Sequence, residues 1–161
     1  MVGANWNIGV TLGDANDYVG VPDESLIEGG KNYCVHVYFA SKLPADLSQR
    51  IYDANFSMIG QWFDGFRVMW VSYISNGSTI LEVHFSTASD IGGGWTVGSL
   101  KSMYMTHPLF EGHPVNSVVV FRIGNGGNDN GGTGGFGVLP MLIVAIIAFL
   151  FVASVLGGKK K

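Results

Sequence analysis

Three segments of the chain are rich in residues that favour β-strands, and a hairpin turn joins two of them. They are residues 32–40 (NYCVHVYFA), 66–74 (FRVMWVSYI) and 79–87 (TILEVHFST). Asn76-Gly77 lies between the last two segments and predicts a tight β-hairpin, because both residues tolerate a positive φ. Both alternating faces of residues 66–74 are largely apolar, which predicts a central strand covered on both sides.

Residues 44–63 predict an amphipathic helix. Their apolar positions follow helical spacing and form one stripe, made of Leu47, Ile51, Ala54, Met58 and Trp62. Pro44 suits the first turn of this helix, and Asp64-Gly65 is expected to end it.

Weaker strand patterns cover residues 5–12, 99–105 and 115–123, and residues 13–30 are expected to form a loop because Gly, Asp and Asn are frequent there. Together these patterns predict an α+β domain over residues 1–123. Its core is an antiparallel sheet of about five to seven strands, packed against one amphipathic helix.

Residues 138–156 (VLPMLIVAIIAFLFVASVL) predict a single C-terminal transmembrane helix. The segment carries no charge, and at the helical rise it spans about 28 Å, close to the thickness of a bilayer core. The alternative is a buried helix of a soluble protein, but such helices rarely run this long without a charged residue. The predicted anchoring side chains are Pro140, Leu142, Ile143, Ile146, Ile147, Phe149, Leu150, Phe151 and Leu156.

A glycine-rich linker and a basic tail flank the predicted membrane segment. Residues 124–137 (GNGGNDNGGTGGFG) favour a flexible coil that reaches roughly 20 Å, with ordered turns as the alternative. Residues 157–161 end in Lys159, Lys160 and Lys161, which are expected to meet lipid headgroups. The positive-inside rule places this tail inside and the domain outside, yet residues 1–7 show no signal peptide. A removed leader or a membrane inside a virus particle would resolve that conflict.

Charge and cysteine content restrict the function further. The chain has 12 acidic and 9 basic residues, and three of the basic residues lie in the tail, so the domain is acidic. It has too few cations to neutralise phosphates, and we expect it to bind no nucleic acid. The single cysteine, Cys34, cannot form an intramolecular disulfide.

Several side chains could carry chemistry, but none forms a recognisable catalytic or metal-binding motif. Cys34 and His36 share one face of a strand, as a nucleophile or a copper ligand would require. Their pattern favours a buried cysteine beside a half-exposed histidine, because no further partner is visible. His107 and His113, with Glu111 between them, match no common metal-ligand spacing. The side chains of loop 13–30 that offer oxygen ligands do not follow the calcium pattern of an EF-hand; they are Asp14, Asn16, Asp17, Asp23 and Glu24.

The sequence therefore predicts no catalytic residue, no cofactor and no metal site. The expected function is that of a membrane-anchored structural protein, such as a viral minor capsid or virion membrane protein. Its expected partners are the bilayer and other subunits, with Trp6, Trp95 and Phe110 as candidate contacts. The lysine tail could also contact phosphates of packaged nucleic acid. The alternatives are an accessory single-pass subunit of a cellular membrane complex and a membrane-tethered receptor or adhesin, whereas an enzyme is not expected.

Overall fold

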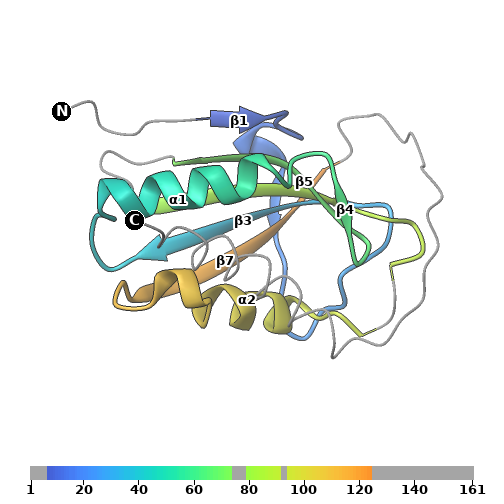
Figure 1. The fold of residues 1–161 in the computed structure, drawn as a ribbon. Coiled ribbons are helices and arrows are strands. Elements are labelled where there is room, and N and C mark those ends of the chain that lie inside the picture. Colours follow the sequence, from blue (N-terminus) through green and yellow to red (C-terminus); the bar gives the residue numbers. More distant parts are fainter. Residues whose placement is uncertain (1–6, 74–78, 92–93, 125–161) are drawn as a thin grey trace.

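The computed structural model describes residues 7–73, 79–91 and 94–124, which form an α+β domain. Six strands build one antiparallel sheet in the order β1-β5-β6-β3-β7-β2, and a very short strand, β4, pairs with β5 off this path. The two α-helices of the described part lie together on one face of the sheet (Figure 1). The predicted α+β class with an antiparallel sheet is thereby confirmed for this part of the chain, but two helices and not one pack on the sheet.

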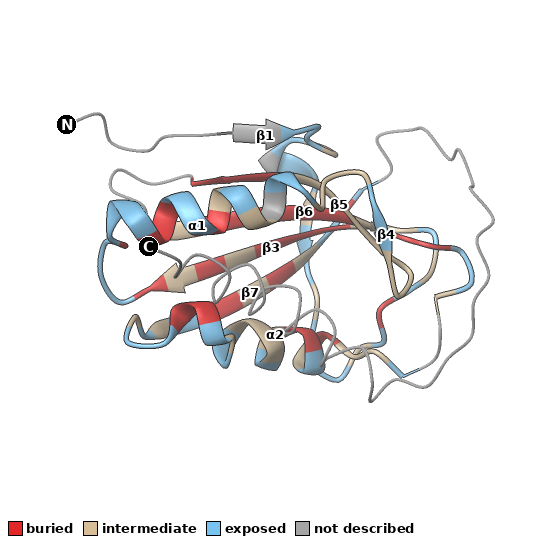
Figure 2. Cartoon of the chain, in the orientation of Figure 1, coloured by how far each residue is buried: buried red, intermediate tan, exposed pale blue. Residues whose placement is uncertain are grey.

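Four long strands form the centre of the sheet. They are β3 (Asn32–Phe39), β5 (Phe66–Tyr73), β6 (Ile80–Thr87) and β7 (Val115–Ile123). β3 pairs with β6 on one side and with β7 on the other, so that Val35 lies opposite both Val83 and Val120. Their β-branched side chains pack well on a pleated surface, and all three are buried in the hydrophobic core (Figure 2).

The edges of the sheet are short. β1 (Asn7–Gly9) pairs with β5, and β2 (Tyr18–Gly20) pairs with β7. β2 follows directly on a single 3-10 turn, Ala15–Asp17. Short edge strands leave few unpaired backbone groups for a second sheet to join. Of the predicted strand over residues 5–12, the described part contains only β1.

The helix α1 (Ala45–Phe56) places Leu47 and Ile51 in the core, as its apolar stripe predicted. The helix is nevertheless shorter than expected, because β4 (Trp62–Phe63) forms a hairpin with β5. Asp64 and Gly65 make the two-residue turn of this hairpin, and both have positive φ, 48° and 79°. The prediction that they end a helix was wrong, since Asp-Gly is also a preferred sequence for a tight hairpin.

Residues 99–105 were predicted as a strand, and this prediction was wrong as well. They belong to a second helix, α2 (Val97–Met105), which begins with a capping box between Thr96 and Ser99. Val97 and Leu100 are buried three positions apart, which is helical and not strand spacing. The strand pattern of this segment is weak, and the cap and the spacing decide for a helix.

The remaining strand predictions over residues 32–40, 66–74, 79–87 and 115–123 are confirmed by β3, β5, β6 and β7. β5 and β6 pair with each other as expected, although the turn between them, residues 74–78, is outside the described ranges. No helix within the described residues is long and apolar enough to cross a membrane. The predicted transmembrane helix and lysine tail, and the predicted linker apart from Gly124, fall in residues 125–161, outside the described part.

Candidate functional site

Four ionisable side chains form a square on the sheet face that lies opposite the helices. Cys34 and His36 come from β3, and Glu82 and His84 come from β6. The register of the two strands places Cys34 opposite His84 and His36 opposite Glu82. Side chains alternate along a strand, so these four share one face while the valines between them point to the helices.

The carboxylate of Glu82 is the hydrogen-bonding centre of this square. Its Oε2 lies 2.8 Å from His36 Nε2, and its Oε1 lies 2.7 Å from His84 Nε2. The backbone N–H of Leu12 donates to His84 Nδ1 at 3.1 Å. Nδ1 of His84 therefore carries no proton, and a neutral His84 donates from Nε2 to the carboxylate.

Tyr18 covers the square from the edge strand β2. Its hydroxyl lies 2.8 Å from His84 Nε2 and donates to Glu82 Oε1 at 3.3 Å. Its ring packs edge-on against the rings of His36 and His84, and at 5.5 Å from the ring of Phe121. Cys34 and His84 are fully buried beneath this cover.

One more aromatic residue reaches the square because of a β-bulge. The register between β5 and β6 shifts between Val68 and Trp70, which brings Trp70 opposite His84. The two rings lie 4.8 Å apart in an edge-on arrangement. The bulged strand is thus turned so that an indole closes the side of the square nearest β5.

The electrostatics of the square favour a charged carboxylate and a neutral thiol. Burial alone would raise the pKa of Glu82, but hydrogen bonds from His36 and His84 outweigh it and lower this pKa to about 2. Burial and the negative charge of Glu82 raise the pKa of the Cys34 thiol. Burial also raises the pKa of the Tyr18 hydroxyl, with contributions from Cys34 and Glu82. A fully buried, protonated cysteine is a poor nucleophile, so this cluster does not favour covalent catalysis.

The donor atoms of the square are suited to a metal ion. Sγ of Cys34, a ring nitrogen of His36 and a carboxylate oxygen of Glu82 all lie within 4.8 Å of one another. In the described ranges this is the only group of three or more His, Cys, Asp or Glu side chains close enough to share an ion. Sequence reasoning noted Cys34 and His36 but missed Glu82 and His84. The available signal was the pair Glu82 and His84, two ionisable residues two positions apart in the largely apolar strand β6.

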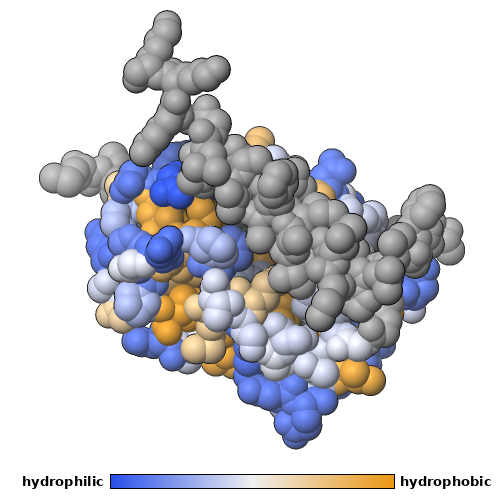
Figure 3. Space-filling model, turned by 60° about the horizontal axis from the view of Figure 1, so that its bottom comes forward, coloured by the Kyte–Doolittle hydropathy of each residue, from blue (hydrophilic) through white to orange (hydrophobic). Residues whose placement is uncertain are grey.

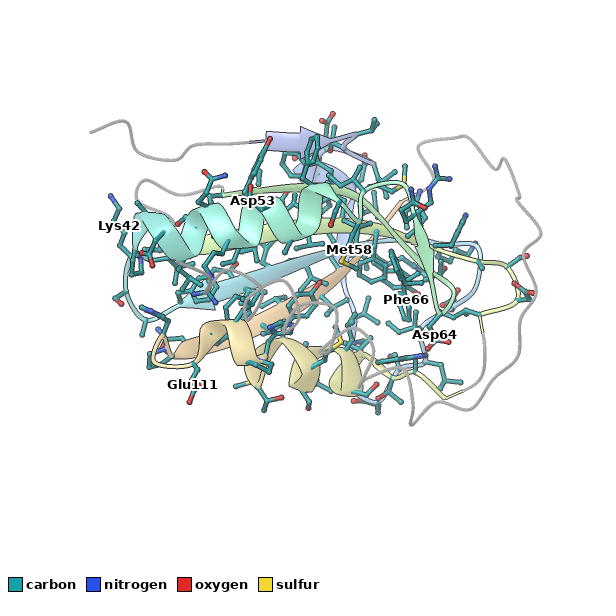
Figure 4. The ribbon with its side chains drawn as sticks, in the orientation of Figure 1. Lys42, Asp53, Met58, Asp64, Phe66 and Glu111 are labelled. Atoms are coloured by element: carbon teal, nitrogen blue, oxygen red, sulfur yellow. The ribbon has the colours of Figure 1, made fainter. Side chains whose placement is uncertain are left out.

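A second feature, an apolar groove, lies on the opposite face of the sheet between α1 and α2. Its volume is about 100 Å³. Figure 3 turns the side that carries α2 toward the viewer and shows apolar residues among polar ones. Met58 and Phe66 lie between the helices, whereas Lys42, Asp53 and Glu111 lie on the outside (Figure 4). Strand residues form the floor and helix or loop residues the walls; the main ones are Val68, Leu81, Val83, Phe85, Ile51, Leu100, Met103 and Tyr104.

The predicted partner contacts have different positions. Trp95 is half-buried at one end of the groove, and its indole N–H donates to Asp64 Oδ2 at 3.3 Å. Phe110 is only 8% exposed and packs edge-on against Phe39, so little of its surface is available to a partner. Trp6 lies outside the described residues.

The other candidate ligands of the sequence remain apart. His107 accepts a hydrogen bond from the backbone N–H of Leu109, and Asp23 forms an ion pair with Lys101. Neither belongs to a group of potential ligands in the part of the chain that the structure describes. Comparisons with protein-family models, curated proteins and solved structures find no match to this chain.

Proposed function

We propose that the protein is a membrane-anchored structural subunit whose globular domain packs against other subunits of a larger assembly. The observation that carries this proposal is the apolar groove between α1 and α2. It is lined by large apolar side chains of both helices and of the sheet between them, of which Phe66, Val68 and Met103 are partly exposed. A partner that covers apolar surface gains roughly 25 cal/mol of binding free energy for each Å² of apolar area removed from water.

The occupant we propose is an amphipathic helix of a neighbouring subunit, which lies over α1 and α2 and inserts an apolar side chain into the groove. α1 and α2 run in opposite directions on the same face of the sheet (Figure 1), and the volume of about 100 Å³ between them holds a side chain and not a whole helix. The lining has one ionisable imidazole, that of His107, and burial lowers its pKa, so it is neutral at pH 7. The contacting stripe of the occupant should therefore be uncharged.

Further apolar residues are exposed on both helices and on β4. Phe56 at the end of α1 and Met105 at the end of α2 are 63% and 50% exposed. Trp62 on β4 is 43% exposed. Aromatic residues and Met are enriched at protein interfaces, which supports a contact in this region.

The polar square supports a structural role in another way. Its cysteine and one of its histidines are fully buried, so a substrate has no direct access to them. Within the structural class we favour a virion membrane. That setting accounts for a lysine tail on the inner side and lets the tail contact nucleic-acid phosphates. The alternatives remain an accessory subunit of a cellular membrane complex and a tethered receptor or adhesin.

Site-specific photo-crosslinking in the native membrane tests this proposal. A photoreactive amino acid replaces Met105 or Phe56 in the full-length protein, and Val19 on the edge strand β2 serves as the exposed control. We expect one defined cross-linked species from the first two positions and none from Val19. Cross-linking that is equal at all three positions, or a domain that detergent releases as a free monomer, would contradict the proposal.

A further inference from the structure

We propose that Cys34, His36 and Glu82 form a Zn²⁺ site covered by Tyr18. This inference is independent of the proposed function, because it concerns the sheet face opposite the groove. It rests on the meeting of a sulfur, a nitrogen and an oxygen donor from two paired strands. These three donors match the ligands that zinc takes in proteins.

The spacing of the donor atoms is close to that of a metal site. They lie within 4.8 Å of one another, on strands whose backbone positions the core holds firmly. Bonds of about 2.0–2.3 Å to a tetrahedral zinc ion keep its ligands roughly 3.5 Å apart. Small side-chain rotations toward the centre of the group are enough to reach that spacing, without a change in the sheet.

The surrounding hydrogen bonds assign His84 to a supporting position. Its Nδ1 accepts the Leu12 N–H, so its Nε2 carries a proton and cannot bind a metal ion. That proton points to Glu82 Oε1 and leaves Oε2, on the side of His36, for the ion. Such bonds to a ligating carboxylate orient it and strengthen metal binding.

The other ring nitrogen of His36 also has a hydrogen-bond partner. Its Nδ1 lies 3.4 Å from the hydroxyl of Tyr38, two residues along the same strand. With Nε2 bound to the ion, Nδ1 carries the proton and the Tyr38 oxygen can accept it in a hydrogen bond. The ring is also fixed by Phe121, whose centroid lies 5.0 Å away.

The donor set favours zinc over other common ions. Calcium and magnesium take oxygen ligands, and this group offers one oxygen donor among three. An electron-transfer copper site needs two histidines with a cysteine, and the Leu12 hydrogen bond removes His84 from that role. One thiolate, one imidazole and one carboxylate remain, which suits a borderline-soft ion without geometric demands of its own.

Metal binding changes the protonation of the site in a balanced way. The Cys34 thiol loses its proton to solvent, and its sulfur forms a bond to the ion as a thiolate. His36 stays neutral, because its proton moves from Nε2 to Nδ1 as Nε2 binds. The two positive charges of zinc are then matched by the thiolate and by the carboxylate of Glu82. Burial of a neutral cluster beneath Tyr18 costs less desolvation free energy than burial of a single charged carboxylate.

Cobalt titration of the full-length protein in detergent tests the site directly. After treatment with a chelator, Co²⁺ is added as the probe and then displaced with Zn²⁺. We expect one equivalent of Co²⁺, visible bands of tetrahedral cobalt and a sulfur-to-cobalt charge-transfer band. Cys34→Ser should abolish the charge-transfer band, and Glu82→Gln or His36→Gln should weaken binding at least about tenfold. The matched control is His113→Gln, since His113 lies outside the cluster.

Two results would overturn the proposal. One is a folded wild-type protein that shows neither cobalt bands nor a zinc-dependent rise in its melting temperature. The other is metal binding that survives Cys34→Ser but is lost in His113→Gln, which would locate the ion on the surface. If Cys34→Ser does not fold, calorimetry of zinc binding to the wild type tests the site instead. Titrations in two buffers of different ionisation enthalpy give the number of protons released per ion. Release of about one proton per ion supports the site, and no release contradicts it.

Discussion

His84 donates a hydrogen bond from Nε2 to Oε1 of Glu82 at 2.7 Å, although the two residues lie on the same strand. His36 approaches the other oxygen from the neighbouring strand at 2.8 Å. A buried carboxylate is costly unless its oxygens are hydrogen-bonded, and here both are. The centre of the sheet therefore tolerates this buried polar network, because its carboxylate is fully hydrogen-bonded.

Glu82→Gln is expected to destabilise the domain by about 2–3 kcal/mol, because it replaces two hydrogen bonds to a charged group. The glutamine side chain has only one acceptor oxygen, so its NH₂ group faces the N–H of either His36 or His84. That imidazole N–H is then left without an acceptor. Urea unfolding of the full-length protein in mild detergent, followed by tryptophan fluorescence, measures the change. Glu111→Gln is the control, because Glu111 is exposed and its replacement should shift stability by less than about 0.5 kcal/mol. Equal unfolding midpoints for the two variants would contradict this account.

The stability of the domain should fall below pH 6.5 because of His107. Burial lowers the pKa of His107 from 6.5, and its Nδ1 accepts the Leu109 N–H, which requires an unprotonated nitrogen. The unfolded chain then binds more protons than the folded chain below pH 6.5, so stability is constant above that value and decreases as the pH falls. The slope approaches at most about 1.4 kcal/mol per pH unit.

His107→Gln should remove this contribution, and His113→Gln should leave it in place. The measurement is the free energy of unfolding of wild type and both variants from pH 5 to 8. Parallel curves for the wild type and His107→Gln would show that His107 does not titrate as proposed.

Gly65→Ala should destabilise the domain more than Gly112→Ala. Both glycines have a φ of 79°, so each alanine meets the same backbone strain. A Cβ at Gly65 would also lie 2.9 Å from Cγ1 of Ile91, whereas a Cβ at Gly112 meets nothing within 4 Å. We expect a cost of about 1 kcal/mol at Gly112 and about 1–3 kcal/mol more at Gly65. Thermal unfolding of the two variants side by side tests the difference, and identical melting temperatures would contradict it.

Removal of residues 157–161 should weaken membrane anchoring without unfolding the domain. The three lysines of this segment are predicted to meet the headgroups, and none of the five residues belongs to the folded part described above. Flotation with membranes should show partial release of the truncated protein, while its melting temperature in detergent stays that of the full chain. Loss of the thermal transition would contradict the separation of domain and anchor.

The sequence predicted those parts of the fold that depend on local patterns. β3 and β7 combine β-branched and aromatic residues, and the Leu47–Ile51 spacing marks α1. Asp64-Gly65 was misread because one dipeptide can stop a helix or turn a hairpin, and only the pairing of Phe63 with Phe66 decides between them. For α2 the capping box and the helical spacing of Val97 and Leu100 decide for a helix over the weak strand pattern.

The polar square could be predicted only in part, for a different physical reason. Alternation places Cys34 and His36 on one face, and the same rule joins Glu82 with His84. No local sequence pattern predicts that β6 pairs with β3, because the chain between these strands contains α1, β4 and β5. The contact between His36 and Glu82 is a consequence of sheet order, and Tyr18 reaches it only because β2 pairs at the far edge of β7.

The β-bulge between Val68 and Trp70 reverses the parity of β5. Before it, the even-numbered Phe66 and Val68 belong to the core beneath the helices; after it, the odd-numbered Val71 and Tyr73 do. The bulge thus keeps the apolar side chains on the helix side past the extra residue, with Trp70 and Ser72 on the polar side opposite His84 and Glu82. Without the bulge, strict alternation over the same residues would exchange the two sets beyond Val68, so that Val71 would face the carboxylate side and Trp70 would face the core. Deletion of the one extra residue would instead remove the bulge and leave each set on its present face. The bulge therefore keeps the two faces of the sheet chemically separate along the whole of β5.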